Sequence, residues 1–275
     1  MRTSNAAMAE KGQAFRALHE RDGAFIIPNP WDAGTARLLA HLGFEALATT
    51  RAGFAFSVGQ RDNTIGRDEM MAHVSKIVSA TDLPVSADLE NGFGDSPEIV
   101  AETIRLAAAS GLAGCSIEDM SGQSGHPIYE HEHAVDRIRA ASEVVRALPL
   151  TFTLTARAEN YLVGKPDLKD TIHRLQAYQT AGADVLYAPG LKSKDDIAAV
   201  VSSVDLPVNV VMGLQGVQLS LAELSAIGVK RISVGSALSR AALGAFLRAA
   251  REMQEHGTFK FAEDAVTYRD ISEMF

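Results

Sequence analysis

Short apolar runs and amphipathic stretches alternate along the chain with a regular period. Each apolar run is about four to six residues long and rich in Val, Ile, Leu and Ala, which is typical of a parallel strand that is buried on both faces. The pattern predicts strands at residues 24–28, 46–50, 85–88, 114–117, 152–156, 185–188, 208–211 and 232–234.

The stretches between these runs have the apolar spacing of helices. Four glycines, Gly43, Gly111, Gly182 and Gly228, directly follow such stretches, as helix C-caps do. The alternation predicts an α/β fold, a (β/α)8 TIM-type barrel, in which residues 1–275 form one domain with an N-terminal helix at 5–20 and a tail at 257–275. The other helices are expected at 32–42, 67–80, 97–110, 131–147, 168–181, 194–203, 219–227 and 239–256.

A barrel places its active site at the carboxyl ends of its strands. In the stretch Pro84 to Gly94 an apolar run ends in Asp88 and Glu90, which project to the same side because side chains alternate along a strand. Paired carboxylates suit Mg²⁺, which prefers hard oxygen ligands and keeps several waters. The alternative is an acidic loop that caps a helix at Ser96-Pro97.

Polar residues follow other predicted strands as well. Glu118 ends the fourth strand and Arg157 the fifth. An arginine can hold a carboxylate or phosphonate with two parallel hydrogen bonds while a metal ion polarises a carbonyl group, so these residues fit a bound 2-oxo acid. Further candidates are Thr50, Arg51, Ala52, Gly53 and Asp62 after the second strand and Asn209 on the seventh.

Charge and cysteine content narrow the class of protein. The formal net charge of −8 argues against a nucleic-acid or membrane-surface partner, because both require a basic face. The single cysteine, Cys115, excludes an internal disulfide and lies in an apolar run, where we expect a buried thiol. The sequence has neither a signal-peptide core nor a long apolar segment, so the expected location is the cytoplasm.

Three motifs resemble those of one enzyme superfamily. Ala87 to Gly94 resembles the Asp-x-Asp-x-Gly-[Tyr/Phe]-Gly signature of the isocitrate lyase and phosphoenolpyruvate mutase superfamily. Gly114 to Asp119 and Thr155 to Glu159 resemble its fourth-strand and fifth-strand motifs, in the same order. The similarity extends over roughly residues 25–253, so the chain is identified as a member of this superfamily.

The resemblance implies a metal site. Asp88, Glu90 and Glu118 match the positions that hold Mg²⁺ directly or through water, and Mn²⁺ accepts the same oxygen ligands. In such enzymes the metal stabilises a pyruvate-like enolate while a C–C or P–C bond breaks or forms.

The resemblance also implies a substrate site. Arg157 matches the substrate-binding arginine and Asp62 the loop aspartate beside the reacting group. Thr50, Arg51 and Ala52 match the segment that holds the carboxylate of the substrate.

The chain departs from the family at three places. The loop from Met120 to Pro127 lacks the catalytic cysteine of the isocitrate lyases and the lysine and asparagine of the phosphoenolpyruvate mutases; His126 is either its acid or base or a turn residue. Glu90 replaces an aspartate. Arg51 replaces a small residue, and either supplies a second cation that favours a dicarboxylate or forms an outward salt bridge.

The expected function is that of a Mg²⁺-dependent lyase that acts on a small 2-oxo acid or its 2-hydroxy-acid adduct by C–C cleavage or decarboxylation. The alternatives are a P–C bond hydrolase or mutase acting on phosphonopyruvate-type substrates, and a metal-dependent 2-oxo-acid binding protein without turnover. A Schiff-base aldolase is not expected, because no predicted strand ends in lysine. A phosphosugar barrel would use the glycines of 213–216 and 235–236.

The expected assembly is a homo-oligomer, a dimer or a tetramer. The resemblance implies that the last helix packs on a neighbouring subunit, and apolar residues between Ala241 and Met253 would serve that contact. The alternative is a helix that covers its own barrel.

Overall fold

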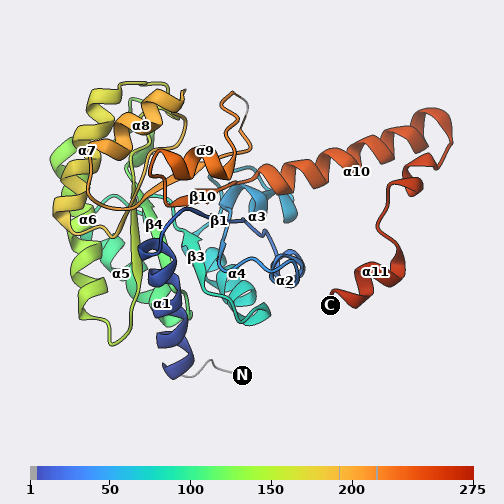
Figure 1. Ribbon diagram of the computed structural model, residues 1–275, viewed down its shortest axis with the longest axis horizontal. Helices are drawn as coiled ribbons and strands as arrows, with labels where there is room; N and C mark the ends of the chain where they lie inside the picture. Colours follow the sequence, from blue (N-terminus) through green and yellow to red (C-terminus); the bar gives the residue numbers. More distant parts are fainter. Residues whose placement is uncertain (1–4, 192, 215) are drawn as a thin grey trace.

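The computed structural model describes residues 5–191, 193–214 and 216–275. In these ranges eight parallel strands form a nearly closed barrel in the order β1-β10-β9-β8-β7-β4-β3-β2, which confirms the predicted fold (Figure 1). Between β1 and β2 a single backbone hydrogen bond, from Ala48 N to Pro28 O at 3.0 Å, continues the ring. The strands are β1 (Phe25–Ile27), β2 (Leu47–Ala48), β3 (Val85–Asp88), β4 (Gly114–Glu118), β7 (Thr153–Arg157), β8 (Val185–Tyr187), β9 (Val208–Val211) and β10 (Arg231–Ser233).

The helices lie close to their predicted bounds. Gly43, Gly111, Gly182 and Gly228 all have positive φ angles, so each ends a helix in the conformation that glycine adopts most readily. The helices at the predicted places are α1 (Asn5–Glu20), α2 (Ala33–His41), α4 (Arg67–Ala80), α5 (Pro97–Ala109), α6 (His131–Ala147), α7 (Leu168–Ala181), α8 (Lys194–Ser202), α9 (Leu221–Ala226) and α10 (Ala237–His256).

Short elements were missing from the sequence prediction. The hairpin of β5 (Met120–Gln123) and β6 (His126–Ile128) is polar and largely exposed, so it lacks the apolar alternation of a half-buried strand. Helix α3 (Arg51–Ser57) is too short to show a helical period. The tail adds a 3₁₀ turn (Lys260–Glu263) and α11 (Tyr268–Glu273).

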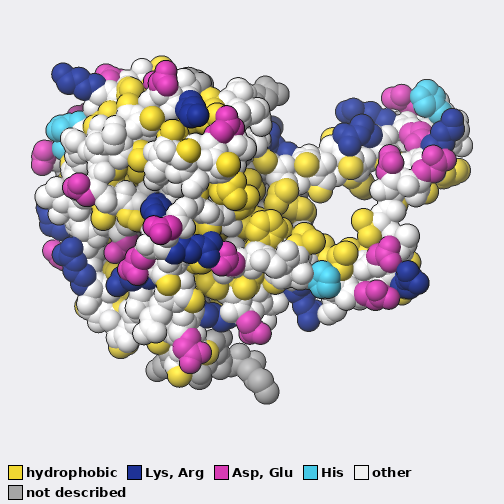
Figure 2. All heavy atoms as spheres, in the orientation of Figure 1, with side chains coloured by type: hydrophobic (Ala, Val, Ile, Leu, Met, Phe, Trp, Pro, Cys, Tyr) yellow, Lys and Arg dark blue, Asp and Glu magenta, His cyan; other side chains and the backbone are white. Residues whose placement is uncertain are grey.

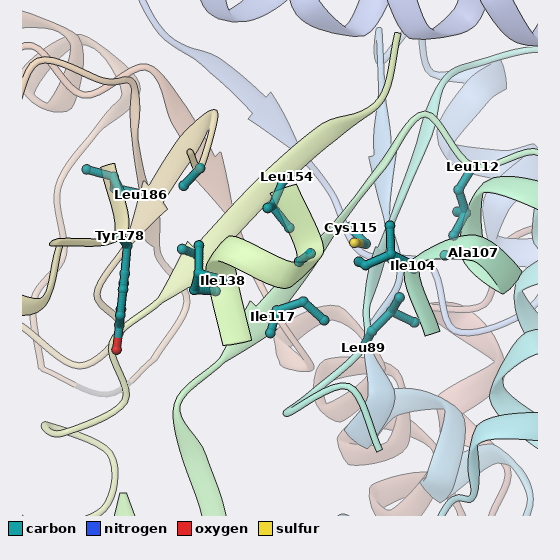
Figure 3. Packing of buried hydrophobic residues seen from close by; sticks show 14 of the residues in the cluster. Leu89, Ile104, Ala107, Leu112, Cys115, Ile117, Ile138, Leu154, Tyr178 and Leu186 are labelled. Atoms are coloured by element: carbon teal, nitrogen blue, oxygen red, sulfur yellow. The ribbon is translucent and has the colours of Figure 1, made fainter. Parts of the chain in front are cut away.

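The main hydrophobic core lies between the strands and the helices around them. In Figure 3, Cys115 and Ile117 of β4 and Leu154 of β7 pack near Ile104 of α5 and Ile138 of α6, and all five are buried. Burial also raises the pKa of the Cys115 thiol, which therefore stays protonated, as expected for a core residue.

Helix α1 covers the amino-terminal end of the barrel. Phe15 is fully buried there in a second cluster with Phe25 and Ile27 of β1. The cluster closes one end of the barrel, so solvent and ligands reach the interior from the carboxyl ends of the strands.

The long helix α10 extends away from its own barrel (Figure 1). Ser239 is its one buried residue, whereas Phe246 and Leu247 have 67% and 47% of their surface exposed. Figure 2 shows hydrophobic side chains along this helix. The tail then returns to the body, where Met274 borders a cleft together with Arg37 of α2. The described helices include none with the length and hydropathy needed to cross a bilayer.

Gly114 tests how closely the strands pack. A Cβ atom at this position of β4 would lie 2.5 Å from the carbonyl oxygen of Thr153 on β7 and 3.1 Å from the Phe15 ring. We therefore expect Gly114→Ala to lower the free energy of unfolding by about 1–3 kcal/mol in urea denaturation. Gly125→Ala is the control, because a Cβ there meets no atom within 4 Å. Equal midpoints for the two variants would contradict this packing.

Candidate active site

A cavity of about 400 Å³ opens at the carboxyl ends of the strands, as the barrel prediction requires. Most residues predicted for the site line it. Gly53 and His126 are the predicted residues that do not. The predicted residues on the cavity wall are Thr50, Arg51, Ala52, Asp62, Asp88, Glu90, Glu118, Arg157 and Asn209.

One row of polar side chains crosses five neighbouring strands. Glu118, Arg157, Tyr187, Asn209 and Arg231 are successive Cα partners in the register of β4, β7, β8, β9 and β10. Directly paired residues of parallel strands project to the same face, so the sheet register brings these five together inside the barrel.

Arg157 is the centre of an acidic cluster. Its Nη1 donates to Oδ1 of Asp88 at 3.0 Å, its Nε donates to Oε1 of Glu159 at 2.9 Å, and its Nη2 lies 3.2 Å from Oε2 of Glu118. Burial disfavours the charge of Arg157, but Glu159, Glu118 and Asp88 outweigh it and raise its pKa. Burial also raises the pKa values of Glu118 and Glu159, against the opposing effect of Arg157. Three carboxylates thus share one guanidinium, which leaves an excess of negative charge.

Arg51 points inward. Its side chain is 5% exposed, its Nε donates to Oδ1 of Asp62 at 3.0 Å, and its Nη1 forms an ion pair with Glu90. The outward salt bridge considered from the sequence is therefore absent from the described residues. Two of the three departures from the family, Arg51 and Glu90, contact each other.

Glu90 has an unusual environment. Its φ of 52° is in the left-handed region, where few residues other than glycine lie. Burial raises the pKa of Glu90 to about 7, although Arg51 acts in the opposite direction. Its buried Oε1 has no hydrogen-bond partner among the described residues, which leaves one carboxylate oxygen for a ligand.

The acidic pair does not cap the next helix. Ser96 is the N-cap of α5, and its side chain accepts a hydrogen bond from Ile99 N at 3.4 Å. The backbone of the motif is instead held from outside, because Arg137 of α6 donates to the carbonyl oxygens of Asn91, Gly94 and Asp95. The capping alternative therefore does not account for Asp88 and Glu90.

Two predicted residues lie away from the cavity wall, and a third, Asn209, lines it with its amide already paired. His126 is exposed on β6 and borders a small separate cleft with Ser121. Gly53 is buried in α3, where its N–H donates to Oγ1 of Thr50 at 3.3 Å and caps the helix. Asn209 lines the cavity with both ends of its amide hydrogen-bonded to protein groups.

Several residues on the cavity wall escaped the sequence analysis, Tyr187 and Arg231 among them. Tyr187 belongs to an apolar run, where an aromatic residue is typical of the core, and Arg231 precedes the predicted eighth strand by one residue. An arginine beside a strand is usually exposed. The signal that could have found both is register: they are the strand positions directly opposite Asn209.

The family model described as phosphoenolpyruvate phosphomutase matches residues 15–254. The chain belongs to this family, and so to the phosphoenolpyruvate mutase and isocitrate lyase superfamily of lyases and mutases that act on pyruvate-like substrates.

Relatives within the superfamily carry different descriptions. A protein of Burkholderia cenocepacia J2315, provisionally described as a lyase/mutase, is 65% identical with a TM-score of 0.96 over 98% of this chain and 96% of its own. A second structure from that organism, provisionally described as a phosphonomutase, is 37% identical with a TM-score of 0.82 over 89% of this chain and 99% of its own. The 2-methylisocitrate lyase of Salmonella typhimurium is 35% identical over 64% of this chain and 61% of its own.

A buried histidine below the cavity should make the fold sensitive to acid. Burial and the nearby Arg231 lower the pKa of His19 to about 3. The unfolded chain therefore binds one more proton between about pH 6.5 and 3, and the free energy of unfolding falls by about 1.4 kcal/mol per pH unit as the pH decreases through this window.

His19→Gln removes this titration. Urea denaturation between pH 4.5 and 7 should give a smaller slope of stability against pH for this variant than for the wild type. His41→Gln, at an exposed helix position, is the control and should keep the wild-type slope. A His19→Gln slope equal to that of the wild type would show that His19 is not the buried neutral group.

Proposed function

We propose that this enzyme is a divalent-metal-dependent lyase that cleaves a C–C bond of a small 2-oxo acid, or of its 2-hydroxy-acid adduct, through a pyruvate-like enolate. The observation that carries the proposal is the cluster of Asp88, Glu118 and Glu159 around Arg157 in the cavity at the carboxyl ends of the strands. Family membership and the related 2-methylisocitrate lyase support the class of reaction.

The donor set of the cavity fits a hard divalent cation. Within the described ranges no three His, Cys, Asp or Glu side chains form a group that could hold a metal ion by themselves. Mg²⁺, however, usually takes only one or two carboxylates and keeps several waters. Asp88, Glu118 and the unpartnered oxygen of Glu90 offer such oxygens beside an excess of negative charge, and Mn²⁺ would accept them as well. When bound, the ion would polarise the 2-oxo group and stabilise the charge of the enolate.

Arg51 is better placed than Arg157 to bind a substrate carboxylate. All three nitrogens of Arg157 contact carboxylates of the protein. Arg51 uses Nε and Nη1 for Asp62 and Glu90, and the described residues supply no partner for its Nη2. We assign Arg51, with Thr50 and Ala52 beside it, to the substrate carboxylate.

Asp62 lies at the edge of the cavity and is the candidate for moving a proton. Its side chain is 46% exposed and is held by Arg51. An exposed carboxylate at this place can exchange protons with solvent and still lie close to a substrate bound at Arg51. The exposed position of His126 in another cleft makes it a weaker candidate for the same role.

Two other functions are supported by specific observations. The related phosphonomutase favours P–C chemistry, for which Arg51 could hold a phosphonate instead of a carboxylate. The hairpin β5–β6 brings no acid or base into the cavity, which favours a binding protein without turnover.

Proton NMR of the protein with Mg²⁺ and a panel of oxaloacetate, methylisocitrate, dimethylmalate and phosphonopyruvate separates these functions. We expect pyruvate to appear from a substrate with a C–C bond to cleave, and excess chelator to stop it. Turnover of phosphonopyruvate alone would establish the P–C function. If all four compounds remain intact while they raise the melting temperature in a metal-dependent way, the protein binds without turnover.

Asp88→Ala tests the metal site. We expect loss of turnover by at least about a hundredfold, because an electrostatic group that stabilises the reacting charge commonly contributes that much, with an unchanged melting temperature. Asp22→Ala, an exposed acid that precedes β1, is the matched control and should keep wild-type kinetics. Wild-type kinetics in Asp88→Ala would contradict the assignment of Asp88 to the metal site. Arg157→Ala is a poorer test, because it leaves Glu118 and Glu159 buried without their cation, at a cost of about 3–5 kcal/mol.

We further propose that the enzyme is a homo-oligomer, a dimer or a tetramer, in which α10 packs on a second copy. The exposed Phe246 and Leu247 on a helix that leaves its own barrel support this assembly. Light scattering should give more than one chain per particle for the wild type and a lower mass for Phe246→Asp. Gln254→Asp, on the same helix, is the control and should leave the mass unchanged. A monomeric wild type would contradict the assembly.

A further inference from the structure

Arg231 is a buried cation without an ion-pair partner among the described residues. It is 5% exposed, and its three nitrogens face neutral groups. Nε donates to Oδ1 of Asn209 at 2.8 Å, Nη2 donates to Oγ1 of Thr155 at 3.0 Å, and Nη1 lies 3.4 Å from Nε2 of His19. A buried charge with no opposite charge costs considerable free energy of folding. Because Arg231 lies beside the cavity, we expect a function that offsets this cost.

The chemistry of a guanidinium determines how the next groups are oriented. Arginine has donors and no acceptor, so Asn209 must turn its carbonyl oxygen toward Arg231. The amide nitrogen of Asn209 then faces the other way and donates to Oγ of Ser233 at 3.0 Å. Ser233 is thereby an acceptor from Asn209, and its own hydrogen is available for the hydrogen bond to the Tyr187 phenol.

Tyr187 is the last residue in this series of hydrogen bonds. A phenol oxygen that accepts the hydrogen of Ser233 leaves the hydrogen of Tyr187 free to point elsewhere. The side chain borders the cavity, and its ring lies 4.9 Å from the guanidinium carbon of Arg157. Burial raises the pKa of Tyr187 to about 12, so the phenol keeps its proton at neutral pH.

We propose that Tyr187 donates a hydrogen bond to an anionic oxygen of the bound 2-oxo acid. Arg231 is the positioning residue: it sets the direction of every hydrogen bond in the donor chain, which consists of Arg231, Asn209, Ser233 and Tyr187. A donor held in this orientation before the substrate binds stabilises negative charge without reorganisation. The identity of the ligand rests on the proposed function, whereas the direction of the donor chain rests on the contacts alone.

The test measures the affinity for oxalate, a planar dianion, by calorimetry in the presence of Mg²⁺. Tyr187→Phe removes the hydroxyl and keeps the ring against Arg157, so the affinity should fall about tenfold to a hundredfold, as for loss of a hydrogen bond to a charged group. Tyr268→Phe, in the exposed tail, is the control and should bind as the wild type does.

Asn209→Asp tests the direction of the hydrogen bonds in the donor chain. An aspartate can pair with Arg231, so folding should be retained, but it has no donor for Ser233. Ser233 then donates to the aspartate, and Tyr187 turns its hydrogen toward Ser233. The affinity should fall as far as in Tyr187→Phe, and the double variant should show no further loss. Arg231→Lys keeps a cation with donors only and should lose less.

The outcomes separate this inference from the proposed function. Unchanged binding by Tyr187→Phe would overturn the role of Tyr187 and leave the site standing. Additive losses in the double variant would show that Asn209 acts independently of Tyr187, which overturns the donor chain. If the wild type binds no oxalate, the proposed function and this inference both fail.

Discussion

The candidate site depends on one interaction, the contact of the Arg157 guanidinium with Asp88, Glu118 and Glu159. Buried carboxylates so close together repel one another and lose their hydration, so they need a cation inside the barrel. Arg157 supplies it from β7, and the register of β3, β4 and β7 places it within reach of Asp88 and Glu118. Glu159 follows two residues after the end of β7. One positive charge is too little for three acids, and this imbalance is the physical reason to expect a divalent ion.

The second arginine changes the character of the cavity. Arg51 pairs with both Asp62 and Glu90, so the acidic residues form two groups, each around its own guanidinium. The longer side chain of Glu90, in a left-handed backbone conformation, reaches Arg51. Arg51 and Glu90, both departures from the family signature, therefore form one ion pair beside the group around Arg157. Under the proposed function, Arg51 presents its cation to the substrate carboxylate.

The architecture could be predicted from the sequence because buried parallel strands are apolar on both faces, and the strand ends then located Asp88, Glu118 and Arg157. What the sequence could not predict depends on contacts between distant segments. The inward direction of Arg51 follows from Asp62 and Glu90, and the burial of Arg231 follows from its neighbours on β9 and β7. The amphipathic pattern of α10 does not predict that the helix leaves its barrel, because the same apolar face could cover its own barrel or that of a second copy.

Solvent exchange of pyruvate tests the central claim, enolate stabilisation, without knowledge of the natural substrate. The protein is incubated with pyruvate and Mg²⁺ in D₂O, and proton NMR follows the methyl signal. The account predicts that the enzyme accelerates loss of this signal, because an enolate held in the cavity is reprotonated by deuterium, and that Asp88→Ala or excess chelator removes the acceleration. Exchange at the rate of buffer with Mg²⁺ alone would contradict the claim that this cavity stabilises an enolate.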